Sequence, residues 1–316
     1  MPSSAVCTFT DPDDYAATIR AGTVDLTITG RGDFNAKLTR IDLHHLWMQR
    51  FSDNLSRVCD VGNLASGRTY ITFRTQPGRS LLQTGVELHP SAVMRHSPAP
   101  EYYQRSSGPV SFGTMSLPTD DIASVGGVMS GRDLTPPRDA MLVTPPQAAM
   151  ARLQRLHAAA GDLAENAPEI IANPDAALGL EQMLIEAMVG CLGHPEERES
   201  GQARGQHAIV MRRFRNVVEV NPGEPLYIPE ICKTIGVSES TLRMCCQEHL
   251  GMSPKRYLLL RRMGLARRAL RRAEPDATSV TAVGTRYGFW ELGRFAVVYQ
   301  SLFGESPSAT LRRQPK

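Results

Sequence analysis

The chain has 316 residues, enough for two domains with separate cores, and its 41% hydrophobic and 21% charged residues are typical of globular proteins. These values exclude disordered and fibrous chains, and no apolar run reaches the about 20 residues that a membrane-spanning helix needs. The six cysteines form no C-x-x-C pair, and the first residues lack the basic and apolar regions of a secretory signal. We therefore expect a cytoplasmic protein without a disulfide or zinc framework.

The net charge of +3 conceals two oppositely charged parts. Residues 203–316 contain 19 Lys and Arg against 9 Asp and Glu, whereas residues 1–202 contain 16 against 23. This asymmetry indicates that the C-terminal part faces a polyanion, with chance segregation as the alternative. Charge alone does not distinguish DNA, RNA and anionic lipid.

Alternation of apolar and polar residues predicts a β-rich domain over residues 1–145. The alternation is clearest in four segments that Gly and Pro turn signals separate, at 24–29, 34–43, 68–74 and 110–117. This pattern favours an all-β barrel or sandwich. The Pro-containing stretch 133–147 is expected to end the strands.

Residues 146–192 change to the three- and four-residue spacing of helices, with Met150, Leu153 and Leu156 as the first examples. The polar run 193–206 has no apolar period and is expected to be a linker. From residue 207 to the end the pattern is helical. The expected fold class is therefore α+β, with a β-rich N-terminal domain and an all-α C-terminal domain.

A helix-turn-helix unit is predicted over residues 227–254. Pro229 suits the first turn of a helix, Gly236 suits a tight turn that needs positive φ, and Ser238 is a favourable N-cap for a second helix. The second helix buries Leu242 on its apolar side, so Glu239, Ser240 and Arg243 point away from that side. This layout places its second helix in the major groove of DNA, although any antiparallel helix pair is the alternative.

Residues 279–307 repeat this pattern of a helix, a Gly-containing turn and a second helix. Gly288 lies at the second turn, and Phe295 and Tyr299 supply the buried side of the helix that follows. Both halves end in Gly and Ser-Pro, at 249–254 and 302–307. Two independent matches in one basic segment favour DNA binding over an ordinary helix pair.

The helix between the two units, expected over 254–272, has a length of about 28 Å. That is close to the roughly 34 Å between successive major grooves on one side of B-DNA. Its expected buried stripe consists of Leu259, Met263, Ala266 and Leu270. Arg261, Arg268 and Arg272 lie on another side and are predicted to contact phosphates, with a solvated basic face as the alternative and with Arg262 as a possible brace between the two units.

The segment from about 210 to 313 resembles the DNA-binding domain of the AraC/XylS family of bacterial regulators. The resemblance rests on residues in both halves, which include Ile235-Gly236-Val237-Ser238, Gly251-Met252-Ser253-Pro254, Tyr287-Gly288-Phe289 and Ser306-Pro307. It implies a seven-helix domain with two recognition helices in adjacent major grooves of double-stranded DNA. It also implies contact with RNA polymerase and activation of transcription.

The same resemblance assigns base-reading roles residue by residue. In the first unit these residues are Ser240, Arg243 and Met244, and in the second unit they are Leu292, Gly293, Arg294 and Val297. An Arg can bind guanine O6 and N7 as a fork, whereas Leu292, Gly293 and Val297 offer only apolar contact. We therefore expect the first unit to supply more of the hydrogen-bonded specificity. Glu239 and Glu291 are weaker candidates, because a carboxylate is favourable in any first helical turn.

For the N-terminal part, the resemblance implies a cupin-like barrel that senses a small molecule and a helical segment that forms a homodimer. The effector and its binding residues are not indicated by any motif. Two alternatives remain: an architectural DNA binder whose N-terminal part only assembles protomers, and an amidase-like α/β enzyme domain. The enzyme alternative lacks a reactive Cys at a strand-to-helix elbow, so no catalytic residue, cofactor or metal site is predicted.

Overall fold

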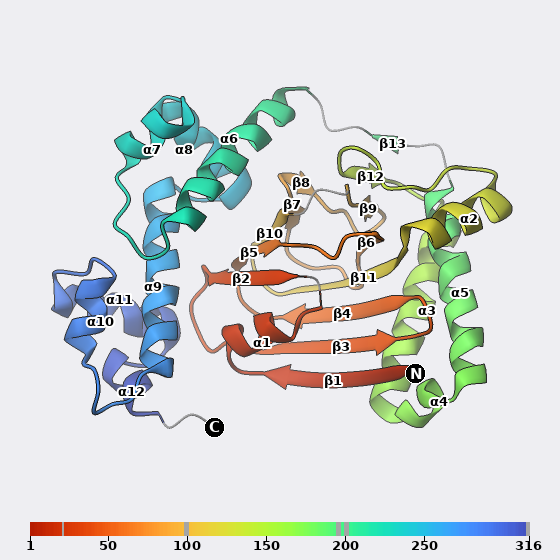
Figure 1. The fold of residues 1–316 in the computed structure, drawn as a ribbon, viewed down its shortest axis with the longest axis horizontal. Coiled ribbons are helices and arrows are strands. Elements are labelled where there is room, and N and C mark those ends of the chain that lie inside the picture. Colours follow the sequence, from red (N-terminus) through yellow and green to blue (C-terminus); the bar gives the residue numbers. More distant parts are fainter. Residues whose placement is uncertain (21, 98–100, 194–196, 199–201, 314–316) are drawn as a thin grey trace. The chain divides into compact units, whose positions relative to one another are not determined.

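The computed structural model describes residues 1–20, 22–97, 101–193, 197–198 and 202–313. Contacts divide the chain into two compact units, drawn in Figure 1. The first unit comprises Met1–Asp25, Phe34–Asn54 and Asp60–Ser200. The second unit comprises Leu26–Asp33, Leu55–Cys59 and Gly201–Lys316. Among the described residues, no helix is both long and apolar enough to cross a membrane.

The β-rich part of the chain contains two open sheets. One has the strand order β1-β3-β4-β11-β6-β9-β12-β13, and the other has the order β2-β5-β10-β7-β8. The strands are β1 Ser3–Phe9, β2 Thr23–Ile28, β3 Ala36–Asp42, β4 Trp47–Asp53, β5 Arg57–Gly62, β6 Arg68–Arg74, β7 Leu81–Gln83, β8 Val86–Glu87, β9 Val93–Arg95, β10 Tyr102–Ser106, β11 Val110–Pro118, β12 Met141–Val143 and β13 Glu197–Arg198.

The helices are mostly C-terminal to the strands, and the predicted α+β class is confirmed. They are α1 Pro12–Thr18, α2 Thr119–Ser130, α3 Gln147–Asn166, α4 Pro168–Ala172, α5 Pro174–Leu192, α6 Gln202–Val220, α7 Ile228–Ile235, α8 Glu239–Leu250, α9 Pro254–Arg272, α10 Val280–Arg286, α11 Leu292–Phe303 and α12 Pro307–Arg312. The strand-then-helix order and the antiparallel pairing differ from the alternating α/β pattern that the amidase-like alternative requires.

Two boundaries differ from those expected. The stretch 133–147 contains a strand, because β12 pairs antiparallel with β9 over a sequence distance that a local pattern does not reveal. Helix α6 begins at Gln202, inside the expected linker 193–206, because Gln, Ala and Arg favour helix without an apolar period. Within that linker, residues 197–198 form β13, whereas 194–196 and 199–201 lie outside the described residues.

The core of the first unit lies between the larger sheet and helices α3 and α5. Cross-strand neighbours on β3, β4, β11 and β6 form an apolar row of Ile41, Met48, Met115 and Ile71. All four side chains are buried in one cluster with residues of α3 and α5. Figure 1 shows these two helices lying along the side of the sheet. The three- and four-residue apolar spacing of 146–192 is thus explained in part by packing on the strands.

Two fully buried histidines belong to this unit. Burial lowers the pKa of His96 to about 4, and its Nε2 lies 2.8 Å from both Thr72 Oγ1 and Gln83 Nε2. Burial, with the nearby positive charge of Arg50, lowers the pKa of His157 to about 3. Both rings are therefore neutral at pH 7.

Acid is expected to destabilise the first unit through these histidines. A His whose folded-state pKa is lowered binds a proton more readily when unfolded, so its contribution is present above about pH 6.5 and is lost as the pH falls. We expect the free energy of unfolding to fall by about 1.4 kcal/mol per pH unit per His between pH 6.5 and 4. Chemical denaturation of wild type and of His96→Gln across this range measures it; equal slopes for the two proteins would contradict the role of His96.

Candidate nucleic-acid interface

The first helix-turn-helix unit has the predicted turn and cap. Helix α7 ends at Gly236, whose φ of 73° is left-handed and whose N–H donates to the Cys232 carbonyl. Helix α8 begins after Ser238, whose hydroxyl accepts from the Thr241 N–H at 3.1 Å. Glycine is favoured at that φ and serine at that cap, so two local sequence signals determine the angle of the pair.

The inner side of this unit is apolar and contains its cysteines. The buried members include Ile231, Ile235, Leu242, Cys245 and Cys246. The Cys246 thiol donates to the Met211 sulfur at 3.9 Å, and burial raises its pKa to about 12. A thiol that stays protonated is a weak nucleophile, so these cysteines pack rather than sense oxidants.

The outer side of α8 presents the residues expected to read bases. Ser240, Arg243 and Met244 are all exposed, and Met244 is 51% exposed although its side chain is apolar. Arg243 makes no hydrogen bond or ion pair with any residue that the structure describes. The Ser240 hydroxyl lies 2.8 Å from the capping Ser238 hydroxyl, so part of its hydrogen-bonding capacity is used within the protein.

The second helix-turn-helix unit repeats this geometry on α10 and α11. Gly288 has a φ of 74° at the turn, and a Cβ there would lie 2.9 Å from Arg262 Nη1. Phe295 is 2% exposed and lies between the rings of Phe289 and Tyr299, at centroid distances of 4.8 and 5.6 Å. These rings belong to a hydrophobic cluster separate from that of the first helix-turn-helix unit.

The outer side of α11 matches the expectation only in part. Gly293, Arg294 and Val297 are exposed, and space is open around the position of a Gly293 Cβ. Leu292 is half-buried, and its Cδ2 lies 3.0 Å from where a Cβ of Gly284 would be. Leu292 is therefore a packing residue between α10 and α11, which the linear sequence did not show.

Two exposed glutamines were not singled out from the sequence. Gln247 and Gln300 occupy the same position in α8 and α11, because each accepts a hydrogen bond from the glycine that ends its helix, Gly251 or Gly304. Each follows Met244 or Val297 by three residues, on the same side of the helix. The internal repeat was the signal that could have identified them.

Helix α9 connects the two helix-turn-helix units. It is buried along Met263, Ala266 and Leu270 as expected, whereas Leu259 is half-buried. Arg262 joins α9 to the second helix-turn-helix unit. Its Nη1 donates to the Tyr287 carbonyl at 3.4 Å, and its guanidinium lies 5.1 Å from the Phe289 ring centroid. Burial lowers the Arg262 pKa.

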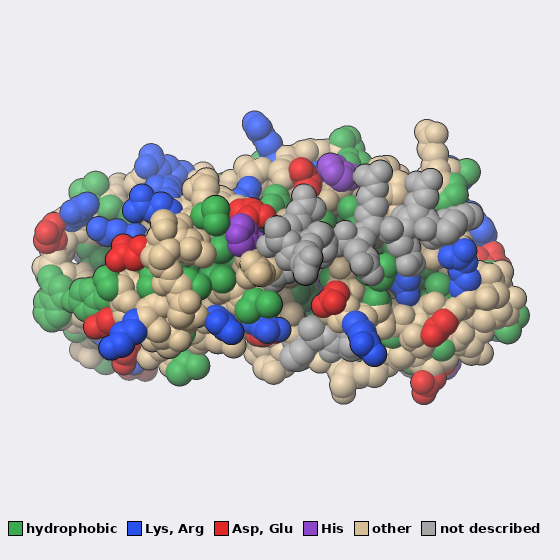
Figure 2. Space-filling model, turned by 90° about the horizontal axis from the view of Figure 1, so that it is seen from above, with side chains coloured by type: hydrophobic (Ala, Val, Ile, Leu, Met, Phe, Trp, Pro, Cys, Tyr) green, Lys and Arg blue, Asp and Glu red, His purple; other side chains and the backbone are tan. Residues whose placement is uncertain are grey.

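The three arginines predicted to contact phosphates differ in exposure. Arg272 is exposed, whereas Arg261 and Arg268 are half-buried and interact within the protein. Figure 2 shows Lys and Arg side chains on the C-terminal part of the chain, at the left, interspersed with hydrophobic ones. Trp290, immediately before the cap of α11, is 78% exposed, so it is not packed across the turn.

One group of potential metal ligands occurs among the described residues. His207 of α6 lies near Glu248 and His249 of α8, with ligand atoms within 4.8 Å of one another. His207 Nδ1 already contacts Glu248 Oε2 at 2.6 Å. This contact accounts for the pair as a link between the two helices.

Comparison with known proteins supports the same domain. Residues 231–313 match the model of a family described as a helix-turn-helix domain. The chain is 30% identical over 151 residues to the Probable thc operon regulatory protein of Rhodococcus erythropolis, covering 48% of this chain and 46% of the relative. It is 34% identical over 102 residues to XylDLEGF operon transcriptional activator 3 of Pseudomonas putida, covering 32% and 31%. These matches thus span less than half of each relative.

Solved structures of similar proteins include an AraC family regulator and an AraC-like activator. A probable AraC family transcriptional regulator from Rhodopseudomonas palustris CGA009 has 30% identity, a TM-score of 0.30, and coverage of 34% of this chain and 98% of that chain. The AraC-like activator CuxR has 14% identity, a TM-score of 0.45, and coverage of 84% and 95%.

Residues 231–313 thus form a helix-turn-helix domain, with two such pairs on one connecting helix. In this part the chain is similar to the named operon regulators.

Proposed function

We propose that the chain is a sequence-specific DNA-binding regulator of transcription, and an activator. The observation that supports this most is the pairing of two exposed recognition surfaces, on α8 and α11, with two separate cores joined by α9. Two rigid units held by one helix can occupy two successive major grooves. The activator role is supported by the relatives from Pseudomonas putida, which are named transcriptional activators.

Base reading is assigned to the exposed residues of the two surfaces. In α8 these are Ser240, Arg243 and Met244, and in α11 they are Gly293, Arg294 and Val297. Leu292 is left out because it packs on Gly284. Gln247 and Gln300 are added, since a Gln side chain can bind adenine N6 and N7 together.

Phosphate binding is assigned to Arg261, Arg268 and Arg272, with Arg272 as the principal contact because it is exposed. Each Arg that neutralises a phosphate releases counterions from DNA.

Affinity for DNA is therefore expected to fall linearly on a log–log plot against salt concentration, with a slope that corresponds to several phosphates. Arg272→Ala is expected to lower the magnitude of that slope by about 1 and to weaken binding to all sequences alike. Fluorescence anisotropy at several salt concentrations measures both effects, with Glu274→Gln as a neighbouring control. A slope near zero in the wild type would rule out the phosphate role.

The N-terminal part is proposed to bind a small-molecule effector and to form a homodimer through helices α3 to α5. Ile170, Leu178 and Met183 on α4 and α5 are between 43% and 47% exposed, which is unusual for large apolar side chains and suits an interface with a second copy. RNA polymerase is the further partner that activation requires. The proposed division is 1–145, 146–192, a connection that ends where α6 begins at Gln202, and a DNA-binding part from there to 316. A chromosomal target is the reason to propose a cytoplasmic location.

The dimer is expected to dissociate when charge enters this surface. Leu178→Glu combined with Met183→Glu is expected to give a folded monomer, because both side chains are exposed in the single chain and only the stabilisation that comes from dimerisation is lost. Analytical ultracentrifugation measures the mass, with Ala176→Glu on the same helix as a test of how far the surface extends. Equal sedimentation of wild type and double variant would contradict the interface.

The proposed function is tested by selecting genomic DNA fragments with the purified chain. Enrichment of a shared sequence motif supports a regulator. Enrichment that follows only base composition would favour an architectural DNA binder instead.

A further inference from the structure

A polar cavity interrupts the apolar layer between the larger sheet and α3. It encloses about 210 Å³ and is lined by Lys37, Thr39, Arg50, Phe51, Ser52, Gln76, Ser111, Gly161, Asp162 and Glu165. All of these residues belong to the first unit. The volume is below the roughly 300–1,000 Å³ of pockets for drug-sized ligands, so it suits a small molecule.

Strand register explains how the cavity arises. The apolar row of Ile41, Met48, Met115 and Ile71 faces the helices, and side chains two residues away along each strand face the same side. The next row contains Thr39, Arg50 and Gly113, and the row after it contains Lys37, Ser52 and Ser111. The helix-facing side therefore changes from apolar to polar over two rows.

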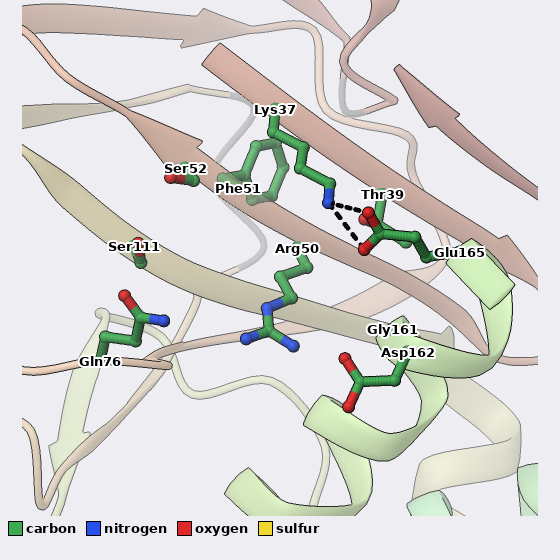
Figure 3. A pocket seen from close by; sticks show the side chains of 10 residues that line it. All are labelled: Lys37, Thr39, Arg50, Phe51, Ser52, Gln76, Ser111, Gly161, Asp162 and Glu165. Atoms are coloured by element: carbon green, nitrogen blue, oxygen red, sulfur yellow. Dashed lines mark hydrogen bonds and ion pairs between the residues drawn. The ribbon is translucent and has the colours of Figure 1, made fainter. Parts of the chain in front are cut away.

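Arg50 is the central residue of this polar region. Its guanidinium points into the space between Gln76 and Asp162, as Figure 3 shows. It is half-buried and makes no hydrogen bond or ion pair with any described residue. The positive charge of Arg50 contributes to the lowered pKa of His157. A half-buried guanidinium with no counter-ion is unusual, since five N–H donors remain to be satisfied.

Gly161 makes room for this guanidinium. A Cβ at Gly161 would lie 3.1 Å from Arg50 Nη1 and 3.4 Å from Arg50 Cδ. A glycine in a helix interior costs about 1 kcal/mol relative to alanine. The close approach of Arg50 explains why α3 has a glycine at this point.

The acidic side of the cavity has one occupied and one available carboxylate. Lys37 Nζ donates to both carboxylate oxygens of Glu165, at 2.6 and 2.7 Å. The Asp162 side chain is exposed and has no hydrogen bond or ion pair among the described residues. Among the described residues, Arg50 and Asp162 thus bring a cation and an anion without partners to the same small space, beside the hydroxyl groups of Ser52 and Ser111.

We propose that this cavity binds a small zwitterionic aminocarboxylate, such as a free amino acid. Its carboxylate pairs with the Arg50 guanidinium as a two-pronged fork, and its ammonium group pairs with Asp162. The ligand then joins β4 to α3, the first helix of the proposed dimer contact. This proposal rests on the proposed function, because the ligand is assigned as the effector of DNA binding.

The test uses the full-length protein and isothermal titration calorimetry. The probes are the twenty proteinogenic amino acids, β-alanine and γ-aminobutyrate, each tested separately, followed by the deaminated acid and the decarboxylated amine of any probe that binds. At least one zwitterion is expected to bind wild type. Both of its analogues are expected to bind about tenfold more weakly or worse, since each lacks one charge-assisted contact.

Three variants separate binding from folding. Arg50→Gln and Asp162→Asn are each expected to weaken binding of the zwitterion at least about tenfold. Gly161→Ala is expected to weaken it by displacing Arg50 while the melting temperature is kept or raised, because alanine favours the helix. Arg155→Gln, on an exposed position of α3 outside the cavity, is the control and is expected to bind as wild type does.

The proposal is overturned if none of the probes binds, if Arg50→Gln binds as wild type does, or if the deaminated acid binds as tightly as the zwitterion. Operator binding is measured on the same preparations with and without the ligand. Binding of DNA without binding of any probe refutes the cavity site and leaves the regulator intact. Binding of a probe without sequence-specific DNA binding refutes the regulator, and binding of both without mutual influence refutes the effector role.

Discussion

Replacing Arg243 with Ala is expected to remove the preference for one base pair of the operator while binding elsewhere in the site persists. Arg243 is exposed on α8 and has no partner among the described residues, so its guanidinium is available to a guanine edge. A bidentate contact of this kind discriminates by about 1–3 kcal/mol, which is about 5- to 150-fold in affinity. Competition binding with operators substituted at each position measures the effect.

The control for this substitution is Arg212→Ala, which removes an exposed Arg of α6 outside both recognition surfaces. It is expected to leave the order of preferred bases unchanged. If Arg243→Ala weakened binding to every operator variant by the same factor, Arg243 would contact a phosphate instead of a base.

Replacing Phe295 with Ala is expected to remove the second recognition unit. The ring is 2% exposed and contacts Phe289 and Tyr299 in the core of that unit. Truncating a buried Phe to Ala costs about 3–5 kcal/mol, because the lost contacts leave a cavity. The first helix-turn-helix unit has its own core. We therefore expect protection of one major groove to be lost and protection of the other to remain.

Ser301→Ala is the matched control, since Ser301 is an exposed position of the same helix. Surface substitutions of this kind change stability by no more than about 0.5 kcal/mol. Thermal unfolding and footprinting of both variants measure the two effects. A Phe295→Ala protein with wild-type stability and an intact two-groove footprint would show that the two helix-turn-helix units do not fold around separate cores.

The recognition domain was predictable from sequence because its signals are local. Gly236 and Gly288 have the positive φ that the turns require, and Ser238 caps α8 as its position indicated. The inward packing of Leu292 depends on the path of α10, which a linear pattern does not contain. Exposed positions such as Gln247 became visible only when the two helices could be aligned by their terminal glycines.

The cavity of the first unit was not predictable, because its residues are far apart in the sequence. Lys37 and Glu165 are separated by 128 positions, and they meet only because β3 pairs with β4 and α3 crosses this end of the sheet. The strand segments themselves were identifiable from alternation, but alternation does not give the register between strands. The row of Thr39, Arg50 and Gly113 therefore required the structure.

We propose that one protomer reads two successive major grooves with α8 and α11. Hydroxyl-radical and methylation footprinting of the purified chain on its best genomic fragment tests this reading of two grooves. We expect two protected major-groove segments per protomer with centres about one helical turn, or 10–10.5 base pairs, apart. A single protected groove for the intact wild-type protein would contradict the reading of two grooves by one protomer.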